Sequence, residues 1–209
     1  MTSSIRTWHR RSAVVIVLFA LLHLANHLVS LAGIDAHLHW MDQARRVYRH
    51  VLAETLLLAC VAFQVGSGVW FVARGWKTRR GPLPWLQALS GLYLAFFLLV
   101  HVGAVLYGRA VLGLDTNFYF AAAGFFVPPY AWFFAPYYFL AVLALFVHLG
   151  CAAYWLAPTA KARLRGALVA LPLVAGTGVA LMIVMSLSGR IQPVDLPAAY
   201  KATYLPDTP

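Results

Sequence analysis

Charged residues are scarce in this sequence. Lys, Arg, Asp and Glu together make up 11% of its 209 residues, whereas 62% are hydrophobic, and the mean hydropathy is +0.76. Soluble domains carry about 25% charged residues. A chain with so few charges cannot cover the surface of a soluble domain, and its composition indicates an integral membrane protein.

Acids and cysteines are scarcer still. The chain has six acidic residues and two cysteines, Cys60 and Cys151, which both fall within apolar runs. This distribution argues against a disulfide framework, and the absence of a CxxC or CxxCH motif excludes covalently attached c-type haem. The sequence also contains no phosphate-binding loop, dinucleotide fingerprint or nucleophile–base pair. Any enzymatic activity would therefore belong to a complex.

Long apolar runs dominate what remains. Five are long enough to cross a bilayer, which takes about 20 helical residues: 12–33, 51–74, 83–109, 131–157 and 166–188. The first follows basic residues like a signal peptide, but its length and the lack of a small-x-small cleavage site indicate an uncleaved span. We predict an all-α bundle of five spans forming one transmembrane domain over 1–209. Glycines and prolines interrupt the apolar segment 110–130, which we expect to be an outer interfacial loop with a short helix.

The charges sit between the apolar runs and predict the topology. On one side lie ten basic residues: Arg6, Arg10, Arg11, Arg74, Lys77, Arg79, Arg80, Lys161, Arg163 and Arg165. The other side has six basic residues together with all six acids: Asp35, Asp42, Glu54, Asp115, Asp195 and Asp207. Basic loops stay in the cytoplasm, so we expect the N-terminus inside and the tail 189–209 outside, in a bacterial-type inner (cytoplasmic) membrane. The net charge of +10 forms no stripe, so nucleic acid is not an expected partner.

Four polar residues lie deep inside four of the spans: His27, Gln64, His101 and His148. A polar residue in lipid is costly and is a functional candidate by default. With about 1.5 Å of rise per residue, His27 and His101 fall in the outer half of the membrane. Gln64 and His148 fall at or just below the middle. His23 lies one turn before His27 on the same face and could substitute for it.

These positions resemble a known family. The chain is similar to the membrane-anchor cytochrome b subunit of succinate dehydrogenases and fumarate reductases, in the single-chain, five-helix, dihaem form. The patches that carry the resemblance are His27-Leu28-Val29, Gln64-x-x-x-Gly68, Leu86-Gln87-x-x-Ser90-Gly91, His101-Val102 and Phe146-Val147-His148. The resemblance covers nearly the whole chain in topology but only short patches in residue identity.

The resemblance implies cofactors and partners. His27 and His101 would hold the iron of an outer haem b, and His148 would be one ligand of an inner haem. Gln64 stands where the family has histidine, and a glutamine amide lacks a basic nitrogen lone pair for iron. One haem is therefore expected, and the inner haem lacks a ligand. Gln87 and Ser90 would lie near a quinone headgroup, and soluble flavoprotein and iron–sulfur subunits would bind on the inner side.

Other interpretations stay open. The histidines could be hydrogen-bonded packing residues, with Gln64 and His148 paired across the bundle, in a haem-free scaffold or interaction protein built on the same five helices. A small transporter is a third possibility, although no inverted repeat or polar pore stripe is visible. We expect His37, His39 and His50 to be solvated in or beside an outer loop, and His9 to be a terminal surface residue. A metal site at His37-x-His39 would need further ligands. For Glu54 we expect an ion pair with Arg49 or His50.

Overall fold

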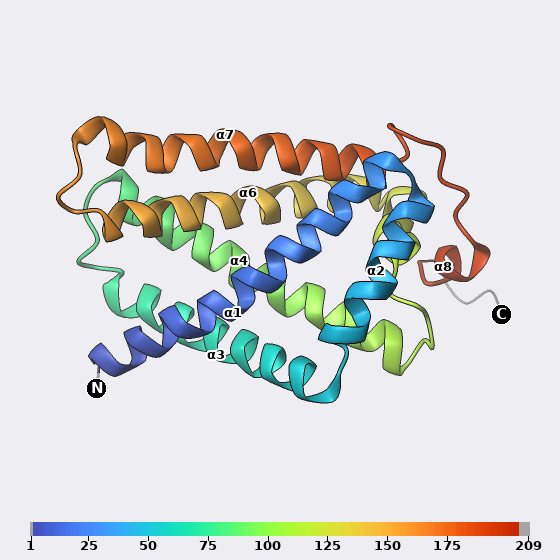
Figure 1. Ribbon diagram of the computed structural model, residues 1–209, viewed down its shortest axis with the longest axis horizontal. Helices are drawn as coiled ribbons and strands as arrows, with labels where there is room; N and C mark the ends of the chain where they lie inside the picture. The colour runs from blue at the N-terminus through green and yellow to red at the C-terminus, as the bar shows by residue number, and fades with distance from the viewer. Residues whose placement is uncertain (1, 205–209) are drawn as a thin grey trace.

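The chain folds into long helices that run side by side. The computed structural model describes residues 2–204, and its five long helices are α1 (Thr2–Val29), α3 (Val51–Gly75), α4 (Pro82–Ala110), α6 (Ala131–Leu156) and α7 (Ala162–Leu187) (Figure 1). Each is long and apolar enough to cross a membrane. The predicted fold class, an all-α bundle with five spans, is confirmed. Asp207 and the rest of 205–209 lie outside the described residues.

Local sequence signals mark where several helices begin. Gly81 has a φ of 82°, in the left-handed region that favours glycine, and Pro82 then occupies the first turn of α4, where its missing N–H costs nothing. The short helix α5 (Phe118–Ala122) begins at Asn117, whose side chain accepts hydrogen bonds from the backbone N–H groups of Tyr119 and Phe120. These signals fix the bounds of the connections between spans.

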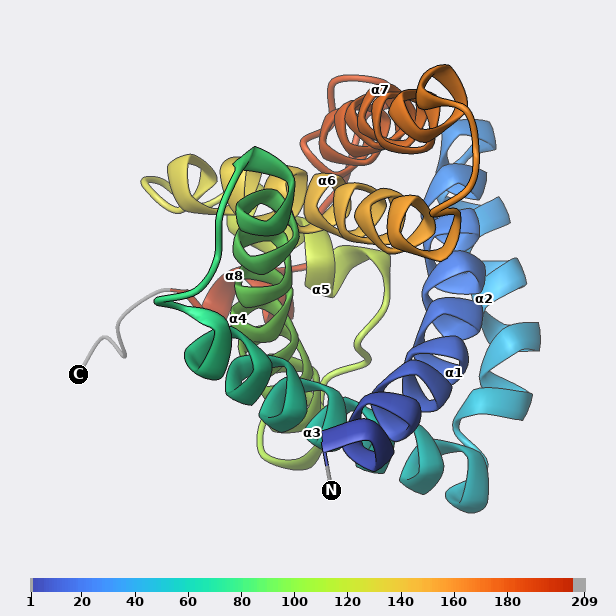
Figure 2. The same ribbon diagram turned by 90° about the vertical axis from the view of Figure 1, so that its left-hand side faces the viewer.

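The spans are not a simple parallel stack. Seen along the bundle, α6 lies between α4 and α7, and α3 lies next to α4 (Figure 2). Helix α1 crosses the bundle diagonally: it packs on α3 near the N-terminus and reaches α7 with its other end (Figure 1). This crossing carries the α1 histidines past the face of α4.

A helix that we did not predict follows α1. The segment expected to be an outer loop folds as α2 (Ile34–Tyr48), which lies across one end of the bundle (Figure 1). It is amphipathic, and its buried residues His37 and Met41 are spaced by four, one helical turn. The expectation that His37 is solvated is wrong, because its exposed fraction is only 2%. His39 and His50 are exposed, as expected.

The apolar segment after α4 supplies part of the core. Phe118 of α5 is fully buried against residues of α6 and α7, among them Val142, Ile183 and Leu187. A 3-10 turn (Ala123–Phe125) follows α5, and the short helix α8 (Ala198–Ala202) packs on it. The Tyr200 hydroxyl of α8 donates a hydrogen bond of 3.0 Å to the carbonyl oxygen of Asp115. The tail is thereby tied to the same end of the bundle as α2.

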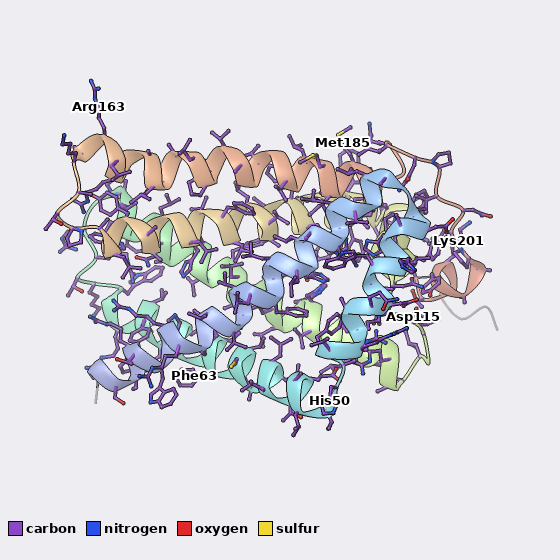
Figure 3. The ribbon with its side chains drawn as sticks, viewed as in Figure 1. His50, Phe63, Asp115, Arg163, Met185 and Lys201 are labelled. Atoms are coloured by element: carbon purple, nitrogen blue, oxygen red, sulfur yellow. The ribbon has the colours of Figure 1, made fainter. Side chains whose placement is uncertain are left out.

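The two ends of the bundle differ in charge. Every acid among the described residues lies at the end that holds α2 and α8, where Asp115, His50 and Lys201 are labelled in Figure 3. Arg45 and Asp115 form an ion pair of 2.7 Å there. Glu54 pairs with Arg109 of α4, not with Arg49 or His50, so that expectation is wrong. We call the opposite end, which carries the N-terminus and Arg163, the basic end.

Candidate functional site

Four imidazoles form a row that crosses three helices. The ring centroids of His101 (α4) and His23 (α1) are 6.0 Å apart, those of His23 and His27 are 4.8 Å apart, and those of His27 and His37 (α2) are 5.3 Å apart. We call these four residues the histidine row. It leads from the interior of the bundle to the buried face of α2.

The first and third spans thus do bring histidines together. His23 is the α1 residue whose ring lies against His101, and His27 lies one turn further toward α2. The ring of Phe97, one turn before His101 on α4, stacks on the His101 imidazole with centroids 4.9 Å apart and planes 12° apart. This stacking restricts the rotation of the His101 ring.

Hydrogen bonds fix only the α2 end of the row. The Nδ1–H of His37 donates to the carbonyl oxygen of Asn26 at 2.8 Å, and the Asn26 amide approaches His37 Nε2 at 3.4 Å. Burial lowers the pKa of His37, and the charge of Arg45 lowers it further, whereas the hydrogen bond to the Asn26 carbonyl raises it. His37 is thus held as a neutral ring.

The remaining polar atoms in and beside the histidine row lack hydrogen-bond partners among the described residues. His27 Nδ1 and Asn26 Oδ1 are buried and have no hydrogen-bond partner among the described residues. No hydrogen bond joins the rings of His23 or His101 to the described part of the chain. Buried polar atoms are normally paired, so an unpartnered group calls for an explanation, such as a ligand or an ordered water.

The separation of the His23 and His101 rings is close to that of two imidazoles bound to one metal ion. Metal–nitrogen bonds of about 2 Å would place the centroids of two imidazoles on opposite sides of a metal ion about 6 Å apart. The observed 6.0 Å matches this value, and neither ring makes a hydrogen bond within residues 2–204. A cavity of about 20 Å³, the size of one water, reaches His23 from the α2 side and is lined by Asn26, Trp40 and Tyr48.

His148 lies apart from the row and is fixed differently. Its Nδ1–H donates to the carbonyl oxygen of Gln87 at 3.1 Å, with the Ser90 hydroxyl oxygen at 3.2 Å. A donor at Nδ1 leaves a lone pair on Nε2, the tautomer of a metal-binding histidine. Gly91 packs directly on the ring, since a Cβ there would lie 2.9 Å from His148 Cε1. Here the glycine serves close helix packing.

Gln64 does not pair with His148 as expected. Its amide donates to His9 Nε2 at 3.0 Å, and the Ser12 hydroxyl donates to Gln64 Oε1 at 2.7 Å. His9 Nδ1 in turn donates to the Ser67 hydroxyl at 2.7 Å. This α1–α3 network satisfies Gln64 without a cofactor. It also overturns the expectation that His9 is a plain surface residue.

Sequence reasoning missed His9, Asn26, His37 and Phe97. One signal was available: His9 precedes His27 by 18 residues, which is five helical turns, so both lie on one face of α1. His37 and His39 do not converge on one site, because His37 is buried and His39 is exposed. Within residues 2–204, no group of three or more His, Cys, Asp or Glu side chains converges as metal ligands. The side chain of Gln87 makes no hydrogen bond within these residues, whereas its backbone carbonyl accepts one from His148.

Comparisons with known proteins add no identification. No protein-family model, no curated protein and no solved structure matches the chain.

Proposed function

We propose that the protein is a b-type cytochrome subunit that carries one haem between α1 and α4 and exchanges electrons with a membrane quinone. The observation that supports this most directly is the 6.0 Å separation of the His23 and His101 rings. His23 and His101 would hold the iron. His27, one turn away, is the alternative α1 ligand that the sequence pattern favours.

The haem would supply reversible one-electron transfer, and the protein's residues would position it. Phe97 holds the plane of the His101 ring by stacking. Asn26 and His37 hydrogen-bond to each other and thereby fix the α2 end of the histidine row. The apolar side chains around the row would lower the polarity around the iron, which affects its reduction potential.

We propose that the quinone, as the substrate, binds near Ser90 and His148. Ser90 is 7% exposed, and its hydroxyl approaches the His148 ring, so a polar group lies within an otherwise apolar wall. Soluble flavoprotein and iron–sulfur subunits, the partners that the resemblance implies, would bind at the basic end. An inner haem is not part of the proposal, because Gln64 is engaged by His9 and Ser12.

Haem quantification on single variants tests the proposal. We would purify the wild type, H23A, H27A, H101A and H148A and measure haem per chain by pyridine haemochrome. The expected result is about one haem per chain, lost in H23A and H101A and kept in H148A. Loss in H27A with retention in H23A would move the α1 ligand to His27. A folded wild-type protein without a Soret band would refute the haem proposal.

A haem-free scaffold is the second candidate. It is favoured by the α1–α3 network, in which Gln64 finds partners for both its amide groups from His9 and Ser12. In this case the histidine row would serve only to pack the helices. The alanine variants would then change the stability of the bundle without changing its haem absorption spectrum. The same set of purified proteins therefore separates the two candidates.

A further inference from the structure

The connection between α3 and α4 holds an arginine with an unused donor. The Arg79 guanidinium lies over the Trp85 ring, with its central carbon 5.2 Å from the ring centroid, and against Gly75, where a Cβ would lie 3.1 Å from Nη2. Its Nη1 is buried and has no hydrogen-bond partner among the described residues. A fixed guanidinium with a free donor is suited to bind a phosphate or carboxylate oxygen.

The rest of the molecule does not provide that acceptor. All acids among residues 2–204 lie at the opposite end of the bundle. The neighbouring Arg80 differs from Arg79, because it donates to the carbonyl oxygens of Lys77 and Arg79 at 2.9 and 3.1 Å. Lys77 is exposed beside them and adds a third positive charge. Within residues 2–204 nothing accepts a hydrogen bond from Arg79 Nη1, so a bound anion can supply the acceptor.

An apolar groove begins directly beside Trp85. It has a volume of about 390 Å³ and is lined by Pro82, Leu83, Trp85, Leu86 and Leu89, which cover the first two turns of α4. Trp85, which lines it, meets Trp76 edge to face at 4.8 Å. Tryptophans at the ends of spans mark the headgroup level of a bilayer. The groove therefore extends from headgroup depth toward the hydrocarbon.

We propose that this groove binds an anionic glycerophospholipid. Its phosphate would accept hydrogen bonds from the Arg79 guanidinium, with Lys77 adding positive charge, and one acyl chain would lie along Leu83, Leu86 and Leu89. The combination of a fixed phosphate donor and an adjoining apolar groove distinguishes a lipid from an acidic protein surface, which would need the cations alone. This inference is independent of whether the protein binds haem.

Native mass spectrometry can test the site on the full chain. Delipidated protein in neutral detergent would be titrated with phosphatidylglycerol or, in parallel, with phosphatidylcholine of the same acyl chains. We expect the first phosphatidylglycerol to bind about tenfold more tightly than phosphatidylcholine, a preference that R79Q abolishes. R163Q is the matched control: Arg163 projects from the same end and loses the same charge, so binding should not change (Figure 3).

A groove variant separates lipid from other anions. L86W would fill the groove and weaken phosphatidylglycerol binding while leaving Arg79 in place. If inorganic phosphate alone displaced the lipid at equal concentration, or if L86W bound like the wild type, the site would be one for a free anion and the proposal would fail. Equal losses of phosphatidylglycerol binding in R79Q and R163Q would likewise overturn the proposal, because they would show that the overall surface charge attracts the lipid. Should R79Q not fold, the wild-type lipid preference and L86W still decide the question.

Discussion

Glu54 of α3 and Arg109 of α4 form an ion pair at the end of the bundle that carries α2. Their side chains are 26% and 32% exposed, and a second contact joins Arg109 Nη2 to Glu54 Oε2 at 3.5 Å. Glu54 is the only carboxylate placed within an apolar run of the sequence. The pair links two spans that share few other polar contacts.

Removing one partner of this pair should destabilise the bundle. E54Q leaves the Arg109 guanidinium partly buried without its carboxylate, at a cost of about 1–2 kcal/mol. We expect a lower unfolding midpoint in detergent. In a double-mutant cycle, E54Q and R109Q should be less than additive, since each removes the same interaction. Additive effects would mean that the two side chains do not interact.

His37 should make stability dependent on pH. Its pKa is lowered in the folded protein, so the unfolded chain binds the proton more readily. The neutral ring therefore stabilises the fold fully above about pH 6.5, and this contribution is lost as the pH falls from there toward the lowered folded pKa. Unfolding midpoints measured between about pH 7.5 and about pH 5 should fall less steeply in H37Q than in the wild type.

The matched control for this experiment is on the same helix. His39 is exposed, so H39Q should keep the pH profile of the wild type. A wild-type slope in H37Q would show that His37 does not contribute to the pH dependence.

Two glycine-to-alanine substitutions should differ in their effect on stability. G91A places a Cβ 2.9 Å from His148 Cε1 and must displace the ring from the Gln87 carbonyl, which should destabilise the protein by about 1–3 kcal/mol. At Gly66 a Cβ would meet nothing within 4 Å, so G66A should be neutral or stabilising, because alanine favours the helix. Thermal unfolding of both variants checks this, and equal midpoints would contradict the packing of Gly91 on His148.

The topology predicted from the charges can be tested by labelling. With the native cysteines replaced (C60S, C151A), R163C at the basic end should resist a membrane-impermeant maleimide in intact cells, whereas K201C at the opposite end should react. Both residues are exposed and lie at opposite ends in Figure 3. Labelling of R163C alone would invert the predicted orientation.

The five spans could be predicted because each is a continuous apolar run of bilayer length, a signal that needs no tertiary information. Helix α2 could not be recognised in the same way. Its histidines and other polar residues are typical of a loop, and only the spacing of His37 and Met41 indicates a buried helix face. Burial of His37 depends on Asn26, a partner on another helix that no local pattern identifies.

The sequence predicts that histidines of α1 and α4 lie close together but not which of them pair. Matching depth placed α1 and α4 histidines together, and the structure brings His23 closest to His101. The α1 helix crosses the bundle at an angle, so depth counted along the sequence does not decide between residues one turn apart. The crossing angle of α1 also explains why the partners of Gln64 could not be predicted. These partners, His9 and Ser12, lie on α1, and no simple sequence pattern encodes the angle at which α1 crosses α3.

The separation of acids from the ten basic residues gives the molecule a large electrical asymmetry along its long axis. Turning it over in the membrane would carry roughly ten net positive charges across the transmembrane voltage. At about 100 mV this costs on the order of 20 kcal/mol, a work term larger than the stability of most folded domains. In an energised membrane, the voltage alone would therefore keep every copy facing the same way.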